Sequence, residues 1–162
     1  SEEDGKGILS SHLHSEGKHA KELALEGPST SRWVPEIIAE NNPDDESYFP
    51  YMNGQFVFKH AVVRFSEAIV EGLEANGLQK EDINMLIPHQ ANLRIAQFIQ
   101  RKFQLNDDQV YNNIMNYGNT TAASVIIALT EAWEKGKINE GDLVVLAAFG
   151  SGFTWGSVVI RW

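Results

Sequence analysis

The spacing of apolar residues along the chain switches between the period of a helix and the period of a strand. In three segments apolar residues recur at intervals of three and four, which predicts amphipathic helices. The expected helices span residues 56–76, 91–103 and 121–135. Gly77 and Gly136 follow the first and third, where a glycine commonly ends a helix. The apolar positions of the third helix define a face that we expect to be buried: Ala122, Val125, Ile126, Leu129 and Trp133.

Shorter apolar segments between these helices predict strands. They span residues 7–14, 83–87, 143–149 and 153–162, with a brief further strand at 110–112. The segment 143–149 is apolar throughout, as a strand covered on both faces should be, and Gly150-Ser151-Gly152 predicts a turn into an antiparallel return. Strands separated by helices, with one antiparallel return, predict a layered α/β domain whose mixed sheet is mostly parallel and has helices on both faces.

The segment 27–53 interrupts this alternation. It contains four prolines and a polar run, which predict a long excursion loop with room for a helical turn at 35–40. Loops of this length inside a compact domain are commonly functional.

The amino-acid composition excludes several classes of protein for this chain. A chain of 162 residues that is 43% hydrophobic can form one globular core, and no apolar run reaches the roughly 20 residues that span a bilayer. We expect a cytoplasmic protein without membrane insertion. The chain has no cysteine, which excludes disulfides and cysteine nucleophiles within it, and a net charge of -9 disfavours nucleic-acid binding.

Two polar segments fall where α/β proteins commonly bind ligands, between a strand and the following helix. His89 follows the strand 83–87, and it suits a general base or hydrogen-bond donor, or else a structural role in its own turn. Asn119 precedes the helix 121–135, where an N-cap is the alternative to a binding role. His12, His14 and His19 lack an acidic partner at suitable spacing, so we expect no metal site.

Five segments, in this order and spacing, resemble the beta-ketoacyl-acyl-carrier-protein synthase III family over nearly the whole chain. They are residues 7–14 (GILSSHLH), 52–59 with Met52-Asn53-Gly54 and Val57-Phe58-Lys59, 87–95 (IPHQANLRI), 117–124 (YGNTTAAS) and 148–157 (AFGSGFTWGS). One such motif is weak evidence, but five in register are specific. The resemblance is to the carboxy-terminal half of these enzymes.

The resemblance implies a thiolase-like fold, in which two similar α/β halves pack as five alternating layers. It implies that residues 1–162 are the second half, and that the cysteine of a Cys-His-Asn triad lies in an amino-terminal half that this sequence does not include. His89 and Asn119 match the catalytic positions. The implied reaction is a decarboxylating Claisen condensation of acyl-CoA with malonyl-acyl-carrier-protein, which starts fatty acid synthesis. We expect no cofactor besides these thioester substrates, and no condensation by this chain alone.

Further positions carry implied roles. Ser151 matches the middle residue of the oxyanion-hole turn, where many relatives have glycine. The residues implied to contact pantetheine are Gly54, Phe58, Ala91, Asn92 and Phe149. The basic residues implied to dock acyl carrier protein are Arg94, Arg101 and Lys102, although a merely solvated helix face explains them as well. Trp33 is a candidate cap for an acyl pocket.

The implied partners are acyl carrier protein, acyl-CoA, the chain's own amino-terminal half and a second copy of the complete enzyme. Two alternatives stay open. The chain could be part of a synthase III relative that acts in a polyketide or other secondary lipid pathway. It could also be a non-catalytic half-domain that pairs with another chain.

Overall fold

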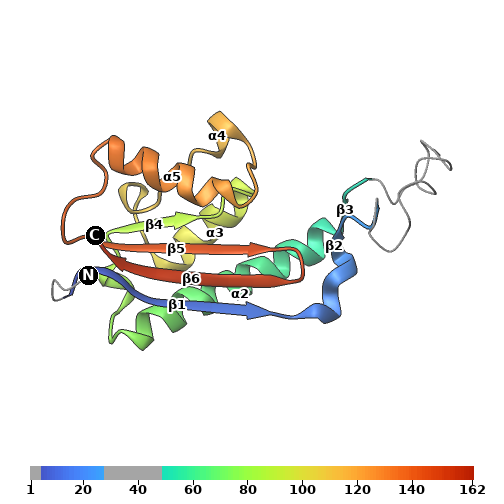
Figure 1. Ribbon diagram of the computed structural model, residues 1–162, viewed down its shortest axis with the longest axis horizontal. Coiled ribbons are helices and arrows are strands. Elements are labelled where there is room, and N and C mark those ends of the chain that lie inside the picture. Colours follow the sequence, from blue (N-terminus) through green and yellow to red (C-terminus); the bar gives the residue numbers. More distant parts are fainter. Residues whose placement is uncertain (1–4, 28–48) are drawn as a thin grey trace.

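The computed structural model describes residues 5–27 and 49–162, and its centre is a four-stranded sheet (Figure 1). The strands lie in the order β1, β6, β5, β4. Their bounds are β1 Gly7–Ser15, β4 Met85–Pro88, β5 Leu143–Gly150 and β6 Thr154–Arg161. Because β4 pairs with β5 in parallel while β6 is antiparallel to both its neighbours, the sheet is mixed.

The mixed sheet and the antiparallel return from β5 to β6 are confirmed, but the expectation that most strand pairings are parallel is wrong. The turn after β5 brings β6 back beside β5, so β1 pairs with the other edge of β6, and two of the three pairings are antiparallel. Apolar patterning indicates that a segment is a strand but not which strand becomes its neighbour. The expected strand at 110–112 is reduced to an isolated parallel bridge between Val110 and Leu86.

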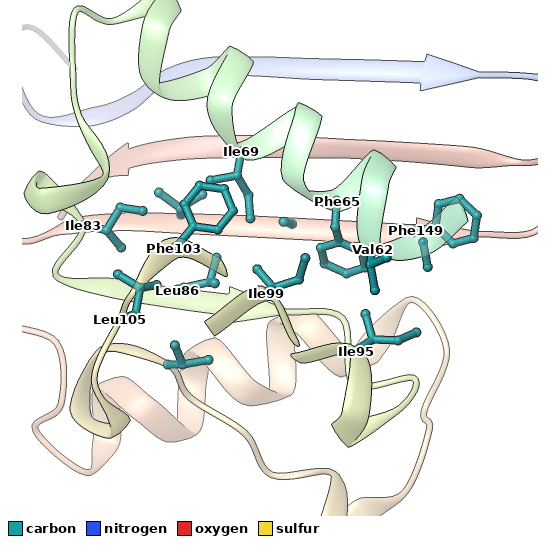
Figure 2. Packing of buried hydrophobic residues seen from close by; sticks show 14 of the residues in the cluster. Val62, Phe65, Ile69, Ile83, Leu86, Ile95, Ile99, Phe103, Leu105 and Phe149 are labelled. Atoms are coloured by element: carbon teal, nitrogen blue, oxygen red, sulfur yellow. The ribbon is translucent and has the colours of Figure 1, made fainter. Parts of the chain in front are cut away.

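Helices cover both faces of the sheet, as expected. The helices α2 (Gly54–Ala75) and α3 (Leu93–Phe103) pack on one face, and α5 (Ala123–Glu134) packs on the other over β4 and β5. Side chains of β5 alternate between the two cores: Val145 joins α2 and α3, whereas Val144 joins α5. Figure 2 shows Val62, Phe65 and Ile69 of α2 facing Ile95 and Ile99 of α3 in the larger core.

The ends of α2 follow from its sequence. Asn53 caps the first turn by accepting a hydrogen bond from the Phe56 N–H at 3.3 Å. Gly77 ends the helix in the left-handed region at φ 65°, and the Leu78 N–H donates to the Leu73 carbonyl at 2.9 Å. Gly136, at φ 67°, ends α5 in the same way. Both predicted stop signals are confirmed.

The predicted buried face of α5 is wrong in part. Val125 and Leu129 of the predicted face pack against the core, as expected, but the fully buried positions are the small residues Ser124, Ala128 and Ala132. Ile126 and Trp133 point away, with 59% and 55% of their surfaces exposed. The sequence pattern identified the helix and part of its packed face, but it did not distinguish the apolar side chains that pack on the sheet from those that stay exposed.

The loop expected at 27–53 ends earlier than the sequence indicates, because its last residues form a strand. Tyr51–Met52 forms a short strand, β3, which pairs with β2 at Leu23–Ala24 after the 3-10 helix η1 (Gly17–Glu22). Residues 28–48, with Trp33 and the expected turn at 35–40, lie outside the described part of the chain.

Three short helical turns connect the larger elements. They are the 3-10 helices η3 (Lys80–Asp82) and η4 (Asp107–Gln109) and the single α-turn α4 (Ile114–Tyr117). Within the two described ranges, no helix has the length and apolar character required to span a bilayer.

Candidate active site

His89 directly follows β4 and continues its pairing with β5. Its backbone N–H donates to the Ala147 carbonyl at 2.8 Å, which fixes the residue at the carboxyl end of the strand. The side chain is half-buried, and its Nδ1 lies 2.6 Å from the Ser124 Oγ. Burial lowers the pKa of His89 below its ordinary value of 6.5, so the imidazole is neutral near pH 7.

Gln90 and Ser124 join the His89 turn to the segment that leads towards Asn119. The Gln90 N–H donates to the Ser124 Oγ at 3.1 Å, and both residues are almost fully buried. The Gln90 Oε1 accepts hydrogen bonds from the Asn113 N–H at 3.0 Å and the Ile114 N–H at 3.2 Å. Since α4 begins at Ile114, this side chain holds the start of the α4–α5 connection against the end of β4.

Asn119 lies in that connection and is exposed. Its Oδ1 accepts a hydrogen bond from the Thr121 N–H at 2.9 Å. The position flanking α5 is Ala122, without a side-chain cap, so Asn119 closes a turn before the helix instead of serving as its N-cap. No described residue bonds to its Nδ2, which leaves both amide hydrogens available to a ligand.

Thr121 adopts a left-handed backbone at φ 53°, which a β-branched residue rarely does. Strained conformations of this kind cluster where the surrounding structure fixes a functional segment. The Ser124 N–H donates to the Thr121 carbonyl at 3.1 Å. The strained turn therefore connects Asn119 to the same serine that contacts His89.

Ser151 is the exposed centre of the turn between β5 and β6. Its Oγ donates to the Leu23 carbonyl of β2 at 2.6 Å, and its backbone lies outside the left-handed region. A side chain at this position is therefore accommodated without strain at φ. Its backbone N–H makes no hydrogen bond to any described residue.

The five residues expected to contact pantetheine come from three elements. Gly54 begins α2 and has open space where a Cβ would lie, and Phe58 one turn later packs edge-on against Phe98. Phe149 is buried near the end of β5, with its ring 4.8 Å from that of Phe153. Figure 2 shows Phe149 at the same end of the core as Ile95, in the first turn of α3.

The other two residues of this set form the β4–α3 connection. Ala91 is half-buried, and its N–H donates to the His89 carbonyl at 2.9 Å. Asn92 caps α3 by accepting from the Arg94 N–H at 2.9 Å. Asn92 thus has a structural role that the sequence motif did not indicate.

The basic residues of α3 all face solvent. Arg94, Arg101 and Lys102 are exposed. Within the described ranges none of the three forms an ion pair with a carboxylate, so their charges are not neutralised internally. Arg101 and Lys102 also lie in the last turn of the helix, where the helix dipole favours positive charge.

The histidines near the amino terminus do not form a three-residue cluster. His12 and His14 contact one carboxylate, that of Glu71, at 3.3 Å and 2.6 Å. His19 packs instead against the rings of Phe56, His60 and Phe153. In the part of the chain that the structure describes, no three His, Cys, Asp or Glu side chains are arranged to hold a metal ion.

The sequence motifs contained Gln90 and Ser124, but their roles were not predicted. A polar residue on the sheet-facing side of α5 is the signal that could have singled out Ser124, because buried hydroxyls need partners.

Comparison with known proteins shows which family this chain resembles. The family model described as 3-oxoacyl-(acyl-carrier-protein (ACP)) synthase III C terminal matches residues 73–162. The beta-ketoacyl-(acyl-carrier-protein) synthase III of Rhodospirillum centenum is 44% identical over 158 residues, which are 97% of this chain and 45% of the relative. The chain therefore spans slightly less than half the length of this relative.

Solved structures agree with the sequence match. The crystal structure of 3-oxoacyl-(acyl-carrier-protein) synthase III from Aquifex aeolicus superposes with a TM-score of 0.84 at 35% identity, covering 100% of this chain and 46% of that one. A priming beta-ketosynthase from the R1128 polyketide pathway superposes with a TM-score of 0.76 at 26% identity, covering 95% and 45%. The thiolase-like fold and the family resemblance are both confirmed. The chain belongs to the 3-oxoacyl-(acyl-carrier-protein) synthase III family, whose carboxy-terminal part it matches.

Proposed function

We propose that this chain supplies the histidine and asparagine of a Cys-His-Asn triad in a 3-oxoacyl-acyl-carrier-protein synthase III. The complete enzyme condenses acyl-CoA with malonyl-acyl-carrier-protein and releases carbon dioxide, the first condensation of fatty acid synthesis. One observation carries the proposal: the Asn119 Oδ1 and the His89 Nδ1 already have internal partners. The atoms left for a substrate are the Asn119 Nδ2 and the His89 Nε2.

These two atoms suit the charge that decarboxylation creates. When a malonyl thioester loses carbon dioxide, negative charge develops on the thioester oxygen, and two neutral N–H donors directed at that oxygen stabilise it. Burial keeps the His89 imidazole neutral, so it donates without adding a positive charge. The resulting carbanion then attacks the acyl group carried by a cysteine, which must come from outside these cysteine-free 162 residues.

The surrounding residues suit thioester substrates. The free Ser151 N–H fits an oxyanion donor at the acylated cysteine. Gly54, Phe58, Ala91, Asn92 and Phe149 suit a narrow passage for pantetheine, because they combine small or flat surfaces with one amide group. The uncompensated charges of Arg94, Arg101 and Lys102 fit an acidic carrier protein.

The fatty acid pathway is favoured over a polyketide pathway by sequence similarity. Identity to the Rhodospirillum centenum synthase is 44%, against 26% to the polyketide priming enzyme. The complete protein is proposed to need an amino-terminal half and to act as a homodimer in the cytoplasm.

A chimera tests the triad assignment. This chain would replace the matching segment of the Rhodospirillum centenum synthase, whose amino-terminal part is retained. We expect His89→Ala and Asn119→Ala each to lower malonyl decarboxylation by roughly 100- to 1,000-fold. Acylation of the cysteine by acyl-CoA, followed by mass spectrometry, should persist in both variants.

His14→Ala is the matched control, because this exposed histidine lies on β1 and contacts Glu71 instead of the candidate site. It should decarboxylate at the rate of the unaltered chimera. Wild-type decarboxylation rates in both the His89 and the Asn119 variants would refute the proposed roles.

A further inference from the structure

Ser124 is a buried polar residue whose side chain contacts His89, and the proposed mechanism leaves it without a role. Only 2% of its surface is exposed, and its Oγ contacts two groups, the Gln90 N–H at 3.1 Å and the His89 Nδ1 at 2.6 Å. A buried hydroxyl carries one hydrogen, which needs an acceptor as much as its lone pairs need donors.

We propose that Ser124 is a positioning residue, whose hydroxyl donates to the His89 Nδ1 and holds the imidazole in the tautomer with its hydrogen on Nε2. This inference rests on the proposed function, since the tautomer matters through what Nε2 offers to the substrate. It assigns no direct contact between Ser124 and the reacting atoms.

The direction of the hydrogen bond follows from the other partner of the serine. A backbone N–H can only donate, so the Ser124 Oγ accepts from Gln90 and keeps its own hydrogen for a different acceptor. Among the residues that the structure describes, the His89 Nδ1 is the other group bonded to this oxygen. Nδ1 must therefore accept, and in a neutral imidazole the hydrogen then resides on Nε2.

The backbone of the His89 turn holds this arrangement in place. Gln90 is 3% exposed, and its Nε2 donates to the Pro88 carbonyl at 2.6 Å. The backbone N–H that donates to Ser124 therefore belongs to a residue whose side chain is also held by a hydrogen bond. Ser124 itself lies in the first turn of α5 and cannot rotate away without leaving buried polar groups unpaired.

The tautomer decides whether His89 can stabilise an enolate. With its hydrogen on Nε2 the ring presents a donor to the thioester oxygen; with the hydrogen on Nδ1 it presents a lone pair to developing negative charge. Groups that hydrogen-bond the far nitrogen of a metal-bound histidine typically change activity by about 10- to 100-fold when removed, and we take that range for His89, whose orientation is fixed in the same way. We expect Ser124→Ala in the chimera to lower decarboxylation within that range, with little change in the KM for malonyl-acyl-carrier-protein.

Nitrogen NMR of the imidazole in this 162-residue chain reads the tautomer directly and needs no catalytic activity. Spectra of ¹⁵N-histidine-labelled chain at neutral pH, with His89→Gln to assign the signal, should show a protonated Nε2 and an unprotonated Nδ1. Ser124→Ala should shift His89 towards a mixture of tautomers. Ser124→Thr, which keeps the hydroxyl, should restore the wild-type pattern.

The outcomes separate the two proposals. A wild-type His89 protonated on Nδ1 overturns the role of Ser124 even if the alanine variant does not fold. An unchanged tautomer in a folded Ser124→Ala variant overturns it as well. A chimera that fails to decarboxylate although its His89 has the Nε2 hydrogen counts against the proposed function and leaves the positioning role of Ser124 supported.

Discussion

The half-buried imidazole of His89 makes the stability of the chain depend on pH. Its pKa in the folded chain lies below the ordinary value of 6.5, because burial disfavours the charged form. Between that lowered pKa and about 6.5 the unfolded chain binds more protons than the folded chain, so the free energy of unfolding falls as the pH falls. The full stability is present above about 6.5.

Comparison with a variant isolates this effect from the other four histidines. Replacing His89 with glutamine removes the titrating group, so urea unfolding of His89→Gln should lose less stability between neutral and mildly acidic pH than wild type. The measurement is the difference between the two free energies of unfolding at successive pH values. Parallel pH profiles would show that His89 titrates normally in the folded chain.

At the scale of one element, α5 packs with its smaller side chains. Ala128 and Ala132 are fully buried against β4 and β5, whereas Ile126 is mostly exposed. Small residues let the helix axis approach the sheet closely, and the buried Ser124 can then reach the His89 turn. The exposed side chain of Ile126 therefore contributes little to the folding of this chain.

A matched pair of substitutions measures this asymmetry. Ile99→Ala, at a fully buried position on α3, should lower the free energy of unfolding by about 2–5 kcal/mol. The same change at Ile126 should alter it by less than about 0.5 kcal/mol, because it removes no buried contact. Chemical denaturation of both variants gives the comparison, and equal losses would mean that Ile126 is buried in solution.

On the scale of the whole molecule, the face that carries α5 is only half covered. α5 lies over β4 and β5, and Leu13 and Ile8 of β1 point to the same side of the sheet with 80% and 71% of their surfaces exposed. Ile126 and Trp133 are exposed on α5 above the same face, and a contiguous exposed apolar surface commonly marks an interface. We propose that the amino-terminal half of the complete enzyme covers it.

Association with a separately produced amino-terminal half of the Rhodospirillum centenum synthase tests this surface. Ile126→Arg should weaken binding at least tenfold in calorimetry, because it places a charge within the proposed interface. Val63→Arg is the control: Val63 is also exposed and apolar, but it lies on α2, across the sheet from α5. If Val63→Arg weakens association and Ile126→Arg does not, the interface lies on the other face.

Much of the candidate site could be predicted from local sequence. Motif spacing places His89 after a strand and Asn119 before a helix, and Gly77 and Gly136 end their helices as predicted. The sequence also predicted wrongly in three places: the share of parallel pairings in the sheet, the burial of Ile126 and Trp133 on α5, and the extent of the loop that contains β3. Each of these depends on contacts between segments far apart in the chain.

The sequence by itself determined which segments are helices and strands, where most helices end and which family the motifs resemble, because these follow from local periodicity, turn chemistry and residue identity. Only the tertiary structure decided that the Ser124 hydroxyl contacts the His89 Nδ1, and that Gln90 links the end of β4 to the start of α4 and α5. Residues 35 positions apart meet through packing of α5 on β4, and no local pattern encodes that distance.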